Sequence, residues 1–170
     1  MATYFGTKQA RAMGFRLYDI SDQYPMTFLT ERSFYPAVVT YLVDRYPKLH
    51  TEFKVAKGEV DFKIGGVNPA LLELAVQPRQ LQDANSHNIK FPGHNQATCL
   101  YSSANRSELE KLKHSTVSVK SRILLLIDLT NKYAPTKLFN GYVDMAAKVG
   151  GPHKATVILI QRHHAYHLNV

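Results

Sequence analysis

The stretch HTEFKVAKGEVDFKIGGVNPALLELAVQ, residues 50–77, decides the fold that we expect for this chain. Apolar residues alternate with acids and bases over 51–55 and again over 59–64, and strand side chains point to opposite faces with period two. A two-residue loop, Lys57-Gly58, would join these segments as a hairpin. Residues 72–77 add a third strand, so the stretch predicts a three-stranded antiparallel meander.

The charged residues of the hairpin are predicted to share one face of the sheet. Counting outward from the loop places Lys54 opposite Asp61 and Glu52 opposite Lys63. Cross-strand acid–base pairs of this kind are common on solvated sheet faces, where each contributes about 0.2–1 kcal/mol. Solvent exposure of this sheet face can therefore account for the charged pairs without a functional site.

Glu73 needs a different explanation. It interrupts 70–76, a run apolar enough for a central strand, and Gln77 follows on the same side of that strand. An unpaired carboxylate in such a place is expensive to desolvate, so a buried acid is usually paired or bound to a metal. We therefore expect a functional site on this face of the sheet.

The order helix, meander, helix and strand over residues 31–130 resembles the PD-(D/E)xK nuclease superfamily. In that family an acid on the second strand precedes an acid-x-lysine motif on the third, and Asp61 and Glu73 fall at those two positions. The resemblance implies a nuclease that uses Mg²⁺ or Mn²⁺, with Asp61, Glu73 and Glu52 as candidate metal ligands. Hard cations of this kind prefer oxygen ligands.

The chain departs from the family pattern at Ala75, where the signature lysine is missing. Lys63 lies two residues after Asp61 and so shares its face, and Lys54 is expected to reach that face from the neighbouring strand. Either lysine could replace the absent base, with Lys63 slightly favoured. Gln77 could orient a water molecule without taking its proton.

The remaining segments predict an α/β fold, a restriction-endonuclease-like mixed sheet flanked by helices. Ser33 caps a helix over 34–46, and a capping box, Asn105-Arg106-Ser107-Glu108, opens another. Apolar strands are expected over 122–129 and 155–160, and a helix over 136–148 would connect them as a parallel crossover. A frayed tail is expected over 162–167. Residues 1–30 are expected to form an N-terminal arm or extra helix, and residues 31–170 a single nuclease-like domain.

The chain's charge favours a polyanionic partner. The formal net charge of +8 suits nucleic acid, because lysine and arginine neutralise phosphates and release counterions. The partners that we expect are a nucleic acid, with DNA favoured, and no membrane, with a homodimer left open. Candidate nucleic-acid contacts are Arg79 and Lys90 in the long polar stretch 78–100, and Lys111 and Lys113 on an outward helix face.

Two functions from different classes remain open. The first is a Mg²⁺-dependent nuclease that hydrolyses DNA phosphodiester bonds. The second is a catalytically degenerate module of the same fold that binds nucleic acid or assembles with a partner, for which Ala75 is the strongest argument. A single cysteine and the lack of a long apolar segment predict a soluble cytoplasmic protein.

Overall fold

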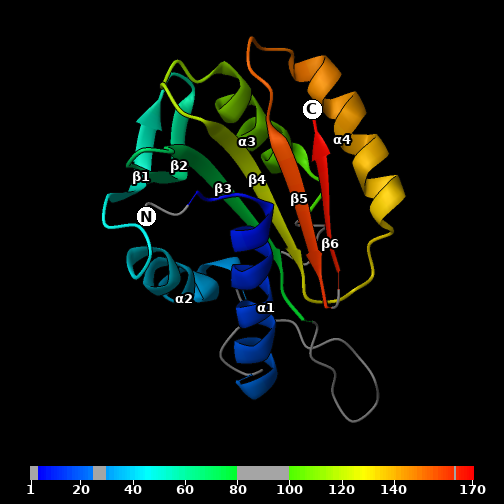
Figure 1. Ribbon diagram of the computed structural model, residues 1–170. Coiled ribbons are helices and arrows are strands. Elements are labelled where there is room, and N and C mark those ends of the chain that lie inside the picture. Colours follow the sequence, from blue (N-terminus) through cyan, green and yellow to red (C-terminus); the bar gives the residue numbers. More distant parts are fainter. Residues whose placement is uncertain (1–3, 25–29, 80–99, 163) are drawn as a thin grey trace.

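The computed structural model describes residues 4–24, 30–79, 100–162 and 164–170. Over these residues the protein is an α/β fold with four helices and one six-stranded mixed sheet in the order β1-β2-β3-β4-β5-β6 (Figure 1). The elements are α1 (Thr7–Gln23), α2 (Glu31–Val43), β1 (Leu49–Val55), β2 (Gly58–Ile64), β3 (Ala70–Gln77), α3 (Ser103–His114), β4 (Ser121–Asp128), α4 (Pro135–Val149), β5 (Thr156–Gln161) and β6 (His164–Asn169).

The sheet confirms the predicted meander and the parallel crossover. Strands β1, β2 and β3 are antiparallel, whereas β3, β4 and β5 run parallel. The apolar runs of β3, β4 and β5 form this parallel part, as expected for strands that are covered on both faces. The expected frayed tail is wrong, because β6 pairs antiparallel with β5 over its whole length.

The predicted hairpin register is also wrong, by two residues. Ala56 and Lys57 form the turn, and Gly58 already pairs with Val55. Gly58 therefore follows the turn instead of lying within it. Its φ is 124°, a conformation that glycine adopts at low cost.

The corrected register changes which charged residues face each other. Lys54 lies opposite Glu59, and Lys63 lies opposite His50. The predicted pairs Lys54 with Asp61 and Glu52 with Lys63 therefore do not form.

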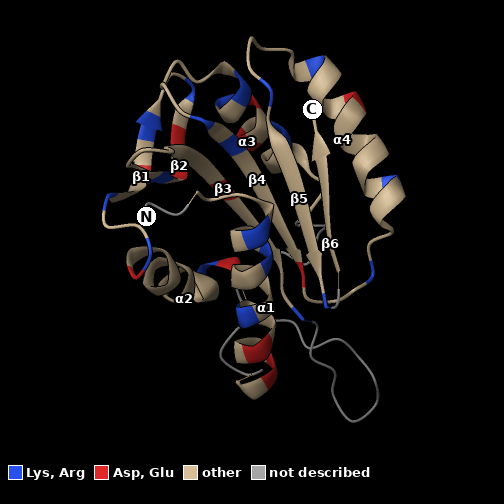
Figure 2. Cartoon of the chain, in the orientation of Figure 1, with Lys and Arg blue, Asp and Glu red and all other residues tan. Residues whose placement is uncertain are grey.

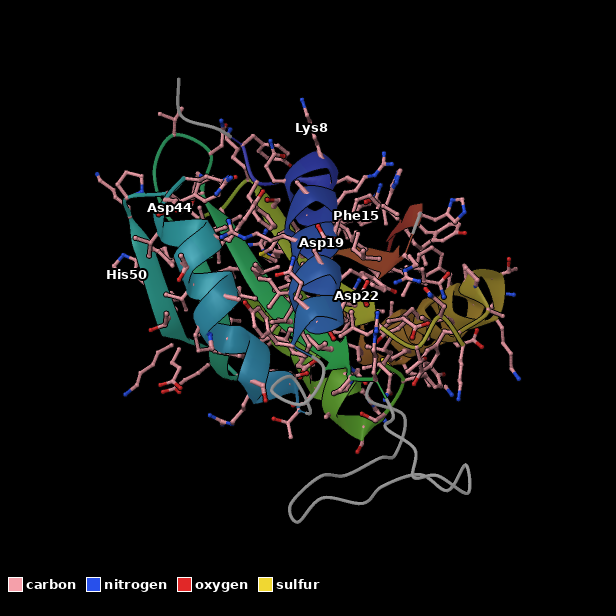
Figure 3. All side chains as sticks on the ribbon, turned by 90° about the horizontal axis from the view of Figure 1, so that it is seen from below. Lys8, Phe15, Asp19, Asp22, Asp44 and His50 are labelled. Atoms are coloured by element: carbon pink, nitrogen blue, oxygen red, sulfur yellow. The ribbon has the colours of Figure 1, made fainter. Side chains whose placement is uncertain are left out.

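Two helices cover each face of the sheet. Helices α1 and α2 lie side by side on one face, and α3 and α4 lie on the other (Figures 1 and 3). The expected extra helix within 1–30 is α1, which buries Met13 and Leu17 against the sheet. Gly14 permits its close approach, because a Cβ there would lie 2.7 Å from the side chain of Ile160. Among the described residues, no helix combines the length and the apolar character needed to cross a membrane.

Strand β2 changes its facing at Asp61. Phe62 packs in the core beneath α1 and α2, but Val60 packs in the core on the α3 and α4 side. Regular alternation would send both to the same face. Pairing between β2 and β3 also extends only from Ile64 back to Phe62, so the two strands part at the residue that carries the candidate carboxylate.

Candidate functional site

Carboxylates occupy the open edge of β3. This strand pairs with β4 along its whole length but with β2 only up to Leu72. Beyond that point, the N–H of Leu74 donates to Asp61 Oδ2 at 2.7 Å, and the N–H of Val76 donates to Glu31 Oε2 at 3.0 Å. Unpaired buried N–H groups are costly, so these two acids stabilise the edge of β3 that β2 leaves unpaired.

Asp61 and Glu73 meet where β2 and β3 part. The N–H of Asp61 donates to Glu73 Oε2 at 3.2 Å, so each carboxylate accepts a hydrogen bond from the opposite strand's backbone. The hydroxyl of Tyr35, on α2, donates to Asp61 Oδ1. The structure thus brings these two acids together, and three hydrogen bonds hold them in place.

The lysine that reaches these acids is Lys111, from α3. Its ammonium forms an ion pair with Glu73 Oε1 and donates to the carbonyl of Glu59 at 2.7 Å. The side chain of Glu73 is 1% exposed and that of Lys111 is 17% exposed. The pair is therefore largely withdrawn from solvent.

The predicted outward basic face of α3 is thus wrong. Lys111 turns towards Glu73, and Lys113 is buried, 8% exposed. The helix packs against β2, β3 and β4, so one flank of it meets the parting strands. Lysine has a long apolar stem that packs well at such an interface.

The acids of this site are poorly compensated. Burial and the neighbouring Asp61 carboxylate raise the pKa of Glu73, and Lys111 offsets this only in part. Burial also raises the pKa of Glu31. On α3, burial and then the charges of Glu31 and Asp61 raise the pKa of Glu108 to about 8. Four acids, Asp61, Glu73, Glu31 and Glu108, therefore lie within electrostatic reach of one another, and Lys111 pairs with one of them, Glu73.

Replacing Glu108 with glutamine should stabilise the protein in alkaline solution. The folded-state pKa of about 8 lies above the ordinary value of 4.5, so the unfolded chain loses the Glu108 proton first as pH rises. Wild-type stability should then fall between about pH 4.5 and 8 and level off above that. The variant lacks this loss, and its advantage at pH 9 should be on the order of 2–4 kcal/mol by urea unfolding.

Glu110 on the same helix provides the control. Its pKa is lowered by the hydrogen bond and charge of Lys57, so it stabilises the fold above its unfolded pKa and loses this effect as pH falls. Glu110→Gln should gain nothing on going to pH 9. If the stability of Glu108→Gln and of the wild type depends on pH in the same way, the folded protein does not raise the pKa of Glu108.

The other candidates from the meander have different surroundings. The Lys63 ammonium lies 4.2 Å from the centre of the Phe53 ring, a cation–π contact. Lys54 is exposed opposite Glu59. Glu52 is exposed with a left-handed φ of 48°. The hydrogen bonds and ion pair found for Asp61 and Glu73 in the described part of the chain involve Tyr35, Lys111 and the backbone of β2 and β3.

Gln77 lies in a second polar cluster, at the carboxyl ends of β3, β4 and β5. There the Tyr133 hydroxyl donates to Gln77 Oε1 at 3.3 Å, and Gln161 Nε2 donates to Asp128 Oδ2 at 2.9 Å. Gln77 is therefore part of the polar packing around Asp128.

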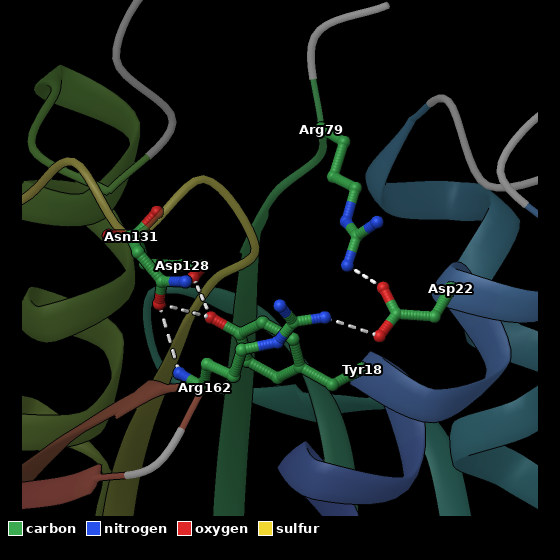
Figure 4. A network of polar contacts seen from close by, with 6 residues as sticks. All are labelled: Tyr18, Asp22, Arg79, Asp128, Asn131 and Arg162. Carbon is green, nitrogen blue, oxygen red and sulfur yellow. Dashed lines mark hydrogen bonds and ion pairs between the residues drawn. The ribbon is translucent and has the colours of Figure 1, made fainter.

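Arg79 lies close to the same cluster, and its guanidinium forms an ion pair with Asp22 (Figure 4). Asp22 also pairs with Arg162 at 2.7 Å, so it binds two arginines. Lys90, the other candidate of this segment, lies outside the described residues.

Sequence reasoning undervalued Glu31, Tyr35 and Glu108. The predicted cap at Ser33 is replaced by Thr30, so α2 begins at Glu31 and its first turn carries that acid into the site. Glu108 was expected to complete a capping box, but Asn105 fills that position by accepting from the N–H of Ser102. A signal was present in the three-residue spacing of Glu108 and Lys111, which puts both on one helix flank.

The donor set at Asp61 and Glu73 fits a hard divalent cation. Among the described residues, no three His, Cys, Asp or Glu side chains lie close enough together to hold a metal ion. Mg²⁺ is nevertheless usually held by one or two carboxylates, with water and phosphate oxygens filling its shell. Glu73 Oε1 is buried, and within the described ranges its partner is the Lys111 ammonium.

Comparison of the chain with protein-family models, curated proteins and solved structures gives no match. Similarity therefore assigns no family, and the geometry of the acids and Lys111 carries the functional argument.

Proposed function

We propose that the protein is a metal-dependent nuclease that hydrolyses phosphodiester bonds in DNA, with Asp61, Glu73 and Lys111 at its centre. The observation that carries this proposal is the ion pair between Lys111 and Glu73. Lys111 supplies, from α3, the lysine that is missing from β3 because position 75 is alanine. With this lysine, the site resembles the PD-(D/E)xK nucleases more closely than the sequence alone does, and we infer a restriction-endonuclease-like arrangement of the sheet.

Each residue has a distinct part in this proposal. Asp61 and Glu73 would hold Mg²⁺ or Mn²⁺, and such a cation lowers the pKa of bound water and offsets charge on a phosphate. The Lys111 ammonium lies on the Glu73 carboxylate, where it can donate a hydrogen bond to the attacking water or to a phosphate oxygen. Tyr35 fixes the orientation of Asp61.

The substrate class follows from charge. A formal net charge of +8 draws the protein to phosphate backbones without any base-specific contact. The excess of acids at Asp61 and Glu73 would repel that backbone unless a cation lay between them. Cation and nucleic acid are therefore expected to bind together at this site.

The test of this proposal is metal binding and cleavage by an Asp61→Asn variant. Wild-type protein should bind Mg²⁺ or Mn²⁺ in calorimetry and cut DNA only when the metal is present. Asp61→Asn should lose metal binding and at least 10²-fold of cleavage, yet keep its fold, because an amide oxygen can still accept from the Leu74 N–H. Asp44→Asn, an exposed change at the end of α2, is the matched control.

A second candidate function rests on the same hydrogen bonds. Asp61 and Glu31 already accept donors from β3, as they would in a degenerate module that kept the fold and lost the chemistry. If the wild type binds neither metal and cuts no DNA, but still binds nucleic acid, this second function replaces the nuclease.

A further inference from the structure

An open cavity of about 600 Å³ lies between the start of α3, the loop after β4 and the start of α4. Two tyrosines, Tyr101 and Tyr133, and two lysines, Lys132 and Lys137, line it together with small and apolar residues of the first turns of α4. Cavities of this size suit small organic ligands. We call it the tyrosine groove.

Tyr101 presents a fixed aromatic ring in this groove. It packs edge-on against Tyr142, with ring centres 5.8 Å apart, and its hydroxyl donates to the carbonyl of Gly141 at 3.3 Å. Gly141 permits this, because a Cβ there would lie 2.7 Å from the Tyr101 ring. Tyr101 nonetheless remains 43% exposed, so the ring is held in place and open to a ligand.

The loop that carries Lys132 and Tyr133 is equally well held. Asp128 accepts from the N–H of Thr130 at 3.0 Å and from the N–H of Tyr133 at 3.1 Å. Between them, Asn131 accepts from the hydroxyl of Tyr18 at 2.9 Å (Figure 4). A buried carboxylate thus organises a loop whose own side chains line the groove, and such preorganisation lowers the entropy cost of binding.

The groove also carries unneutralised positive charge. Neither Lys132 nor Lys137 pairs with a carboxylate in the part of the chain that the structure describes. Basic residues lie both in the loop that leads into α4 and on α4 itself (Figure 2). Aromatic rings beside free lysines match the two parts of a nucleotide, because a base stacks on the ring and a phosphate pairs with the ammonium.

Tyr142 supports the groove from the core. This buried residue packs against Tyr101 and donates to the carbonyl of Leu100 at 2.7 Å. Burial raises the pKa of Tyr142, so its hydroxyl stays protonated and keeps this hydrogen bond.

We infer that the tyrosine groove binds one nucleotide unit of single-stranded nucleic acid, with its base on Tyr101 or Tyr133 and its phosphate on Lys132 and Lys137. The inference rests on the proposed nuclease function for the identity of the strand. A free mononucleotide has the same chemistry, and the experiment separates these two sources.

The test measures fluorescence anisotropy of a labelled thymidine hexanucleotide with the full chain in EDTA, in an Asp61→Asn background that cannot cut. Tyr101→Leu should weaken binding about 5- to 100-fold through lost stacking. The double variant Lys132→Gln/Lys137→Gln should weaken it and reduce the salt dependence, log affinity against log salt, by about 1.4.

The matched controls are Tyr24→Leu and Lys148→Gln, since both residues are exposed and neither lines the groove. They should bind like the parent protein. Thymidine monophosphate is then added as competitor. Once the groove variants have weakened binding, displacement of the hexanucleotide shows that a free nucleotide suffices, and failure to displace it shows that the unit must belong to a strand.

Unchanged binding by Tyr101→Leu and the lysine double variant would overturn the inference. Because EDTA removes any metal, this outcome is independent of cleavage. A wild type that cuts no DNA but needs Tyr101 for binding would overturn the nuclease proposal and retain the groove.

Discussion

Lys111→Ala is expected to reduce metal-dependent DNA cleavage by about 10²–10⁴, the usual contribution of a positioned acid–base group. The reason is geometric, because Lys111 is the lysine whose ammonium lies on the Glu73 carboxylate. The loss should appear in single-turnover rate constants at saturating DNA. Mg²⁺ affinity should stay the same or rise, since the variant removes a positive charge that competes for Glu73.

Lys63→Ala and Lys54→Ala provide the comparison. Lys63 lies over the Phe53 ring and Lys54 faces Glu59, so both variants should keep cleavage within a few-fold of the wild type. If Lys63→Ala loses activity while Lys111→Ala keeps it, the catalytic base is on β2 and the assignment to α3 is wrong. A parallel loss of metal affinity in Lys111→Ala would indicate a structural role instead.

Local pattern was sufficient to predict the sheet. Alternation over 51–55 and 59–64 and the apolar runs of β3, β4 and β5 each follow from strand geometry and burial, and the structure has strands in all these places. The resemblance to the nuclease family placed Asp61 and Glu73 at one site, and in the structure they meet where β2 and β3 stop pairing.

The hairpin register shows where local pattern fails. The prediction placed both Lys57 and Gly58 in the loop, whereas Gly58 begins β2. A shift of this size moves every cross-strand partner, and it removed Lys54 from Asp61. The choice depends on which residue takes a positive φ, and a single glycine near a turn leaves more than one solution.

The missing lysine could not be located from sequence for a different reason. Helical periodicity shows that Glu108 and Lys111 share a flank of α3, but not which strands that flank meets. The contact of α3 with β2 and β3 depends on tertiary packing, which the local sequence pattern does not specify. Solvated basic residues are the common case on helices, so Lys111 and Lys113 were expected to face outward.

The second large effect is expected outside the acid site, at Asp128. Its side chain is fully buried and accepts from the N–H and hydroxyl of Thr130, the N–H of Tyr133 and the amide of Gln161, at 2.6–3.1 Å. Asp128→Ala would leave these donors without an acceptor, and each such buried group costs about 1–3 kcal/mol. We expect the free energy of unfolding to fall by about 3–5 kcal/mol in urea titrations.

Asp128→Asn shows why the carboxylate itself is required. All four groups around Asp128 are donors, whereas an asparagine side chain offers one acceptor oxygen and places its own N–H groups against the rest. This variant should therefore recover only part of the stability lost in Asp128→Ala. Asp144→Asn, exposed on α4, should stay within about 0.5 kcal/mol of the wild type. Full recovery by asparagine would mean that water satisfies the loop donors, and the loop over 129–134 would then lack the fixed anchor on which binding in the tyrosine groove depends.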